Sequence, residues 1–397
     1  MTVVVLLSLL LGSSASATAP RHSTTSAAAS PRPTHAIESL DWALKFASAI
    51  RSDEKDRARA EESVVLDFAV IGALDEGLQR ADRVEGWRKG VASAELAAAL
   101  AAMGRLDEAK VWIAKAEAVR ATISGWQNPR IAAHIANARA AVGEVEGART
   151  NAAVALAEDQ RQYAGRAAAS LAIAYGRAGK LDQALAELAP LDADADIDVA
   201  VARTHAYVEL SKLQSLGMEQ RLALIDKAHR SVAQVSSFLR VESFQSLAEA
   251  ETLAGAKPAA LKTLAEAAGV ARSIPPSAPL KGLLMSGVAK GFTDAGDTTT
   301  GVALLREALE VAPQTQPIER PAVLGAIAAA YRAAGETMES RRVLDLAFSG
   351  AEALVNARPR ALAVVEICRS MGRVDMALDA ATRDRLKTLF AGLKDPW

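Results

Sequence analysis

The sequence of 397 residues contains a single cysteine, Cys368, which excludes an internal disulfide and any metal site built from cysteines. Aromatic residues make up only 4% of the chain, and no alternating segment rich in Val, Ile and Thr is bounded by turns. Sheets favour β-branched and aromatic side chains, whereas the abundant alanine of this chain favours helices. The composition therefore predicts an all-α protein with no sheet.

The chain also lacks an excess of charge of either sign. It has 46 basic and 47 acidic residues, a net charge of −1, and no long run of one sign. Nucleic-acid-binding proteins usually carry a basic face, so we expect no nucleic-acid partner. Glycine-rich phosphate-binding motifs ahead of a strand–helix unit are absent as well, and the sequence predicts no cofactor.

The only long hydrophobic run, VVVLLSLLL at residues 3–11, is too short to span a bilayer but long enough for the core of a signal peptide. Small residues at 15–17 fit an A-x-A cleavage site, so residues 1–17 are predicted to be a signal peptide. No Lys or Arg precedes the run, and the alternative is a cytoplasmic protein with an apolar N-terminus. No cysteine follows the run, so we expect no lipoprotein anchor. The protein is therefore predicted to be exported to the periplasm or secreted, without a stable membrane anchor. Residues 18–35, rich in Ala, Ser, Thr and Pro, are predicted to be a disordered linker.

Residues 36–397 are predicted to form a domain of helical repeats. The unit is clearest at residues 167–188, AAASLAIAYGRAGKLDQALAEL, where two short amphipathic stretches meet at a glycine. Similar glycines recur every 32 to 41 residues, and a glycine suits a tight turn between helices because it adopts positive φ without steric cost. These glycines are Gly72, Gly104, Gly143, Gly179, Gly217, Gly255, Gly296, Gly335 and Gly372.

Two columns of residues keep a fixed distance from these glycines. Five positions after the glycine, eight of nine residues are small, as a close crossing of two helices requires; the column is Gly77, Ala109, Ala148, Ala184, Leu222, Ala260, Gly301, Ser340 and Ala377. Eight positions before it, eight of nine are apolar: Val64, Leu96, Ile135, Leu171, Glu209, Leu247, Val288, Ile327 and Val364. Both columns fail in the same repeat, where a one-residue insertion would bring in Ala223 and Leu210. We therefore predict about nine helix pairs and a final capping helix through Leu386 and Phe390.

Polar signals mark the starts of the first helices. Asn128-Pro129 is typical of an N-cap followed by proline in the first turn. A basic residue recurs near each start, and we expect these side chains to be solvated or paired with acidic neighbours. If instead they lie along one edge, they would suit an anionic ligand. They are Arg88, Arg130, Arg166, Arg203, Arg240, Lys281, Arg320 and Arg360.

Within AYGRAGKLDQALAEL, the residues Tyr175, Gly179, Leu181 and Ala184 occupy the aromatic, glycine, apolar and small positions of the tetratricopeptide repeat. The chain resembles that family over roughly residues 53–391, although its spacing is mostly longer than the family period of about 34 residues. The resemblance implies a right-handed α-solenoid of about nine antiparallel helix pairs whose first helices line a concave face. In this family that face usually binds a protein or peptide. One branch grips a carboxylate with a Lys/Asn/Arg clamp on its inner helices, and the matching positions here contain only one such residue, Asn137.

The sequence predicts no catalytic, cofactor-binding or metal-binding residue. No histidine has another histidine three or four positions away, and the five are His22, His35, His134, His205 and His229. Cys368 falls at an aromatic position of the repeat and is predicted to be buried. Trp87, Trp112 and Trp126 cluster in one region, where packing is favoured over an exposed binding patch.

Together these patterns predict a non-enzymatic, exported scaffold that binds a protein or peptide partner on its concave surface. One alternative is an accessory superhelical subunit of an envelope enzyme complex. A helical enzyme in its own right is less favoured, because no clustered acids or histidines appear at a suitable spacing.

Overall fold

The computed structural model describes residues 33–51, 53–157, 161–192 and 196–394. These residues form 19 α-helices, three short 3-10 helices and no strand, which confirms the predicted all-α class. The predicted signal peptide, residues 1–17, and most of the predicted linker lie outside the described residues. The last two linker residues already belong to the first described helix, which begins at Thr34.

The helices fall into two sets that alternate along the chain. The first helices of the successive pairs are α3 (Glu54–Val70), α5 (Gly86–Ala102), α7 (Gln127–Ala141), α9 (Arg161–Arg177), α11 (Ile197–Ser211), α13 (Ser237–Leu253), α15 (Pro279–Asp294), α17 (Arg320–Ala333) and α19 (Ala357–Gly372). The second helices are α4 (Leu74–Arg80), α6 (Leu106–Ala121), α8 (Val145–Ala157), α10 (Leu181–Leu188), α12 (Met218–Val232), α14 (Lys257–Ser273), α16 (Thr298–Val311) and α18 (Thr337–Glu352). Two helices stand outside this alternation, α2 (Thr34–Ser48) and α20 (Ala380–Ala391). The 3-10 helices are η2 (Ala81–Arg83), η3 (Ala189–Leu191) and η4 (Ala312–Gln314).

Seven of the nine repeat glycines make the predicted left-handed turn between helices, with φ between 74° and 85°. The other two positions correct the prediction. Gly217 has φ −66° and is the N-cap of α12. Gly372 is the last residue of α19, and the left-handed conformation occurs instead at Asp375, with φ 46°.

The column of small residues lies where the two helices of a pair cross. A Cβ atom on Gly77 would be 3.0 Å from the backbone oxygen of Val65, and one on Gly301 would be 2.7 Å from that of Ala289. Two members do not follow the prediction. Ala223 is exposed while Leu224 is buried, so Ala223 is not the residue that faces the first helix in that repeat. Ala377 is also exposed, because residues 374–379 form no helix.

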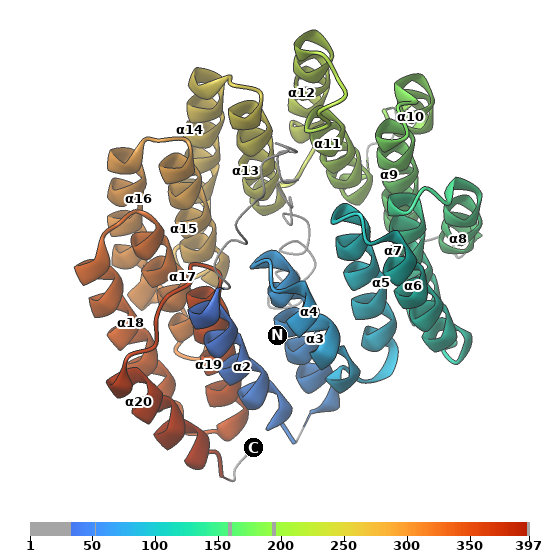
Figure 1. The fold of residues 1–397 in the computed structure, drawn as a ribbon. Coiled ribbons are helices and arrows are strands. Elements are labelled where there is room, and N and C mark those ends of the chain that lie inside the picture. Colours follow the sequence, from blue (N-terminus) through green and yellow to red (C-terminus); the bar gives the residue numbers. More distant parts are fainter. Residues whose placement is uncertain (1–32, 52, 158–160, 193–195, 395–397) are drawn as a thin grey trace, which may run out of the picture.

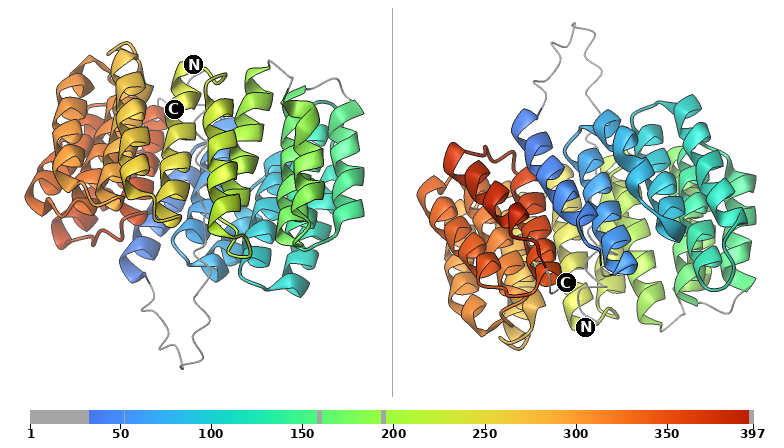
Figure 2. Two further views of the ribbon diagram at one scale, coloured as in Figure 1. Left: turned by 90° about the horizontal axis from the view of Figure 1, so that it is seen from above. Right: turned by 90° about the horizontal axis from the view of Figure 1, so that it is seen from below.

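The missing second helix of the last pair is supplied by the other end of the chain. α2 packs along α19 as the other second helices pack along their own first helices, and α19 also contacts α3. Gly372 allows this close approach, since a Cβ atom there would lie 3.0 Å from Leu40 of α2. Figures 1 and 2 show α2 beside α19 and α20, so the first and the last described helices lie together. The helix pairs therefore form a closed ring, and α20 packs against α2 instead of covering an open end.

Polar contacts hold this seam between the two chain ends. Arg369 of α19 and Arg373, which directly follows that helix, each donate to the buried carboxylate of Asp67 on α3, at 2.6 Å. Burial alone would raise the pKa of Asp67, but the two guanidinium groups hold it below its usual value. Further contacts across the seam join Ala36 N to Asp375 Oδ1 at 2.8 Å, Arg383 to Glu38 at 2.6 Å and Arg358 to Asp53 at 3.0 Å.

Apolar contacts cross the seam as well. The rings of Phe46 on α2 and Phe390 on α20 meet edge to face, with centroids 5.4 Å apart. Leu40, Phe46, Val364 and Leu389 belong to one buried cluster that continues through α17, α15 and α13. This cluster therefore joins the first described helix to the last across the seam, while α5, α6 and part of α7 share a separate buried cluster.

Candidate functional site

The recurring basic residues at the starts of the first helices have a structural role. Arg240 Nε donates to the carbonyl of Val235 at 3.0 Å, and Lys281 Nζ donates to that of Ile274 at 2.8 Å. Arg203, Arg320 and Arg360 make the same kind of bond, each to a carbonyl that follows the preceding second helix. A cation suits this place because the last carbonyls of a helix have no partner within the helix and carry partial negative charge. These five residues bond to carbonyls, whereas we expected solvated side chains or acidic partners; Arg203 also lies 3.8 Å from Asp192.

The second pair and the third pair of the ring make different contacts at this place, and in the second pair the basic residue has an acidic partner, as expected. Arg88 forms a buried ion pair with Glu62. In the third pair, the Asn128 side chain donates to the carbonyls of Ile123 and Arg120 at 2.9 and 3.1 Å. Asn128 therefore satisfies the end of the preceding helix, and the predicted N-cap is wrong: α7 begins one residue earlier, at Gln127.

The three clustered tryptophans differ in exposure. Trp112 is buried, with its ring 3.7 Å from Lys115 Nζ. Trp87 packs edge to face on Trp126, with centroids 5.4 Å apart, and the Arg88 and Arg130 guanidinium groups lie over its ring. Trp126 is 51% exposed. The cluster is thus a packed structural unit with one exposed edge.

Two of the described histidines lie beside a glutamate, and the cysteine is buried. His134 Nδ1 lies 2.6 Å from Glu95, and His229 Nε2 lies 2.9 Å from the buried Glu251. Cys368 is completely buried, as predicted, and burial raises the pKa of its thiol. Within the described part of the chain, no three His, Cys, Asp or Glu side chains are placed to hold a metal ion.

Each first helix leaves one stripe incompletely buried, and the stripes together make the inner face of the ring. On α11, almost every residue from Val199 to Ser211 is buried except Val201, His205 and Glu209. These positions are four residues apart, so they lie on one side of the helix. Neighbouring first helices and the second helices cover the other sides. The sequence prediction of a concave binding surface concerns this inner face.

The inner face is charged over α11 and α13. Lys212 Nζ donates to Glu209 at 3.0 Å and to Glu249 of α13 at 2.9 Å. Burial lowers the pKa of the nearby His205; Lys212 and two arginines lower it further, and Glu209 opposes them. His205 forms no hydrogen bond with any residue that the structure describes. A neutral, unpartnered imidazole on this face is free to bond to a ligand.

Glu242 of α13 is the most perturbed carboxylate of the inner face. Burial raises its pKa to about 7. One of its carboxylate oxygens is buried without a hydrogen-bond partner in the described structure. A buried oxygen of this kind costs free energy unless a partner satisfies it, so Glu242 is a natural contact for a donor on a ligand.

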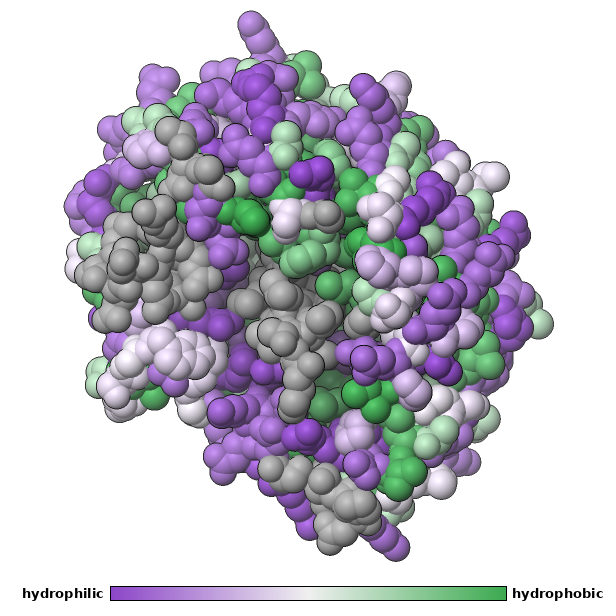
Figure 3. Space-filling model, turned by 180° about the vertical axis from the view of Figure 1, so that it is seen from behind, coloured by the Kyte–Doolittle hydropathy of each residue, from purple (hydrophilic) through white to green (hydrophobic). Residues whose placement is uncertain are grey.

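The inner face changes character over α15 and α17. The stripe there begins with Leu280, Leu283 and Gly287 on α15 and includes Ala322 and Ala326 on α17. None of these five residues is charged, and Gln245 of α13 packs against Gly287. Towards the end of α15 the stripe continues to the ion pair of Lys290 and Asp294. Figure 3 shows hydrophobic residues gathered around the middle of one face of the molecule, with hydrophilic residues along its edge. The ring therefore offers a charged wall and an apolar wall.

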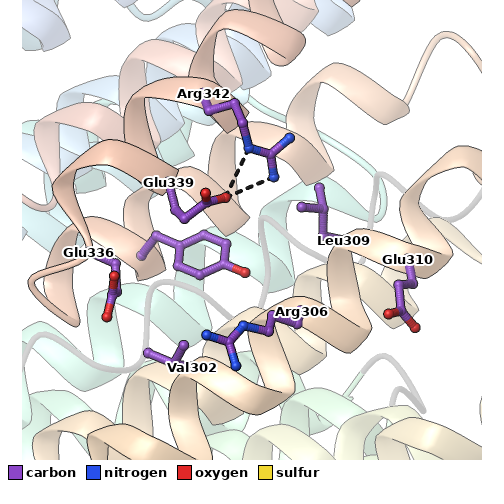
Figure 4. A pocket seen from close by; sticks show the side chains of 8 residues that line it. Val302, Arg306, Leu309, Glu310, Glu336, Glu339 and Arg342 are labelled. Atoms are coloured by element: carbon purple, nitrogen blue, oxygen red, sulfur yellow. Dashed lines mark hydrogen bonds and ion pairs between the residues drawn. The ribbon is translucent and has the colours of Figure 1, made fainter.

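A second concave feature lies on the outside of the ring, between α16 and α18. This α16–α18 groove has a volume of about 420 Å³ and is lined by residues of α16, α17 and the start of α18. Figure 4 shows Arg306 and Arg342 on opposite walls, with Leu309 and Val302 on the α16 side. Arg342 is paired with Glu339 at 2.8 Å. Sequence reasoning missed this groove, because its residues come from three helices and follow no repeat pattern.

No family model matches this chain, and no curated protein is similar to it. None of the helices in the described ranges is both long and apolar enough to cross a bilayer.

Proposed function

We propose that this protein is a non-enzymatic scaffold that holds an extended segment of a protein or peptide against the inner face of its ring. The main support for the proposal is that the inner face has a polar region and an apolar region. Unpartnered polar groups, His205 and Glu242, lie on one wall, and the apolar stripe of α15 and α17 forms the other. An extended peptide offers backbone donors and acceptors together with apolar side chains, so it matches both walls. The resemblance to tetratricopeptide repeats supports the same role.

The closed ring favours an extended segment over a folded partner. The inner face is made by first helices that contact one another around the whole ring, so it has no open side. A flexible segment can reach such a face from either end of the ring, whereas a folded domain has to open the seam.

We further propose that the protein acts after export, in the periplasm or outside the cell. The supporting observation is the apolar run at residues 3–11 followed by an A-x-A site. N-terminal sequencing of the protein purified from its native cells should give Thr18 as the first residue. A protein that retains Met1 and is recovered with the cytoplasm would reject export and leave the inner-face proposal intact.

The proposed function is tested by capture from native cells. The chain from Thr18 onward serves as bait for the envelope fraction, and mass spectrometry identifies what it retains. We expect one protein at a fixed ratio with the unaltered bait. Ala326→Glu places a charged side chain on the apolar wall and should abolish that capture.

The matched control is Met338→Glu, which adds the same charge at a residue of α18 that is 81% exposed on the outside. It should capture the partner as the unaltered bait does, and circular dichroism should show that both variants keep their helix content. Equal capture by the two variants would place binding elsewhere than on the inner face. Capture of nothing by a folded bait would reject the scaffold role.

A further inference from the structure

The α16–α18 groove can be compared with another place in the ring where the same residue types meet. Between α8 and α10, Arg149 donates to the hydroxyl of Tyr175 at 2.8 Å and to the carboxylate of Glu187 at 2.7 Å. Tyr175 belongs to α9, the first helix of the pair that includes α10. One arginine thus bridges a tyrosine and a carboxylate there, and we call these three residues the Arg149 bridge.

The α16–α18 groove contains an arginine, a tyrosine and a glutamate on the corresponding helices, but no bridge joins them. Arg306 of α16 forms no ion pair or hydrogen bond with any residue that the structure describes. Tyr331 of α17 is only 2% exposed, and its hydroxyl has no hydrogen-bond partner in the described ranges. Glu339 is paired with Arg342 instead. The guanidinium and the tyrosine hydroxyl that belong to the Arg149 bridge have counterparts in Arg306 and Tyr331, and these remain available to a ligand.

The Tyr331 hydroxyl remains a donor at neutral pH, since burial raises its pKa. In contrast, the hydroxyl of Tyr207 is satisfied by Asp192 at 3.1 Å. The Tyr331 side chain lines the groove, so a ligand there can accept from its hydroxyl. A guanidinium group and a hydroxyl that line one groove together suit a carboxylate.

The other residues that line the groove restrict which kind of ligand could provide that carboxylate. Glu310 and Glu336 line the groove and have no ion-pair partner within the described part of the chain. With Glu339, the lining holds three carboxylates and two guanidinium groups, so a ligand of high negative charge is disfavoured. Val302 and Leu309 add an apolar surface. The volume of about 420 Å³ lies within the range of small-ligand sites.

We propose that the α16–α18 groove binds a small apolar zwitterion, such as a hydrophobic α-amino acid. Its carboxylate pairs with Arg306 and accepts from the Tyr331 hydroxyl, its ammonium group pairs with Glu310 or Glu336, and its side chain packs on Val302 and Leu309. The groove lies outside the ring, so this site does not depend on the inner-face proposal.

Isothermal titration calorimetry of the full chain with three probes tests the ligand chemistry. L-leucine has both charges, N-acetyl-L-leucine lacks the ammonium group, and L-leucinamide lacks the carboxylate. We expect L-leucine to bind at least tenfold more tightly than either derivative. Equal binding of N-acetyl-L-leucine would overturn the zwitterion and indicate a peptide C-terminus as the source of the carboxylate. Equal binding of L-leucinamide, or no binding of any probe, would overturn the site.

Variants locate the site. Arg306→Met should weaken L-leucine binding at least tenfold, and Tyr331→Phe, which removes one hydroxyl and keeps the buried ring, should weaken it several-fold. The matched control is Arg149→Met, which removes the arginine of the Arg149 bridge and should leave the affinity for L-leucine unchanged. Thermal unfolding of each variant separates lost binding from lost folding. Wild-type affinity in Arg306→Met, or equal losses in Arg306→Met and Arg149→Met, would overturn the assignment.

Discussion

At the scale of single residues, the most consequential side chain is Asp67. It lies fully inside the seam, and its two carboxylate oxygens accept from Arg369 and Arg373, which belong to the opposite end of the chain. Arg369 is itself only 6% exposed. A buried charge without its partner is far more costly than a missing surface pair, so this contact fixes which helices meet at the seam.

Asp67→Asn should therefore lower the free energy of unfolding by about 3 kcal/mol, since it removes the carboxylate that Arg369 and Arg373 share and leaves the buried Arg369 paired only with Glu366. Urea denaturation followed by circular dichroism measures the change. Asp226→Asn breaks an exposed pair with Arg230 on α12 and should cost about 1 kcal/mol or less. Similar small effects of both substitutions would show that the seam does not depend on this charge.

The lowered pKa of Asp67 makes the stability of the folded protein depend on pH, and the direction of that dependence can be worked out. Its folded-state pKa is lowered, so its contribution to stability is complete above its pKa in the unfolded chain. As the pH falls below that value, the unfolded chain takes up the proton first, and the contribution is progressively lost. Acid should therefore open the seam before it affects contacts that do not depend on ionised groups.

Glu242 gives a pH dependence of the opposite sign. Burial raises its folded-state pKa to about 7, above the ordinary value of 4.5. Between these two values the unfolded chain has lost the proton that the folded chain retains, so stability falls as the pH rises through this window. In Glu242→Gln this fall in the free energy of unfolding, about 1–3 kcal/mol between pH 4.5 and 8, should be absent. Urea denaturation at several pH values measures it, and an unchanged slope would show that Glu242 is ionised like a surface carboxylate.

Much of the residue-scale structure could be predicted from the sequence, because it depends on local backbone chemistry. Gly72 and Gly335 take positive φ, and Ala109 and Ala260 are completely buried, as the repeat columns indicate. The partners of the basic residues could not be predicted. Lys281 donates to backbone carbonyls, and every residue has a carbonyl, so no sequence pattern marks the acceptor.

At the scale of helices, α2 has a role that its position in the chain does not suggest. It replaces the second helix that would follow α19, and Leu40 packs against Gly372. Residues 371–381 match the repeat well, yet 374–379 form no helix. Local pattern shows that α19 needs a partner on one face. It cannot show that a helix more than 300 residues away in the chain takes that place.

Leu40→Ala tests how strongly the packing of α2 against α19 stabilises the fold. Leu40 is completely buried, and truncation of a buried leucine costs about 2–5 kcal/mol, because contacts are lost and a cavity remains. We expect a loss in that range in urea denaturation. Leu222→Ala on α12, at a leucine that is 44% exposed, is the matched control and should change stability by about 0.5 kcal/mol or less. Equal effects would mean that α2 is only loosely attached.

At the scale of the whole molecule, closure changes how the helix pairs support one another. In an open array of repeats, each pair contacts only its neighbours, and the two terminal pairs need polar caps. Here α3 and α19 contact each other, so both terminal pairs have neighbours on two sides. Opening the seam would expose Phe46, Val364 and Leu389, which are now part of one buried cluster. The candidate surfaces depend on this closure to different degrees: the inner face requires the whole ring, whereas the α16–α18 groove requires only its neighbouring helices.

Removal of α2 is therefore expected to change the shape of the whole molecule. A chain that begins at Asp53 lacks α2 but retains every other described helix. Its ends should separate, because the remaining contacts between α19 and α3 are few compared with those that α2 makes to both of them. Small-angle X-ray scattering should then give a larger radius of gyration than that of the full chain.

A synthetic peptide of residues 33–51 should restore the smaller radius when it is added to this shortened chain, since the ninth pair accepts its second helix without a covalent connection. The same peptide with Leu40→Asp is the matched control. It places a charge where Leu40 meets Gly372 and should leave the shortened chain expanded. If the shortened chain already has the radius and the thermal stability of the full chain, the contacts of α2 are not what closes the ring. If neither peptide binds an expanded chain, the ninth pair needs α2 to be covalently attached, and closure has to occur as the chain folds.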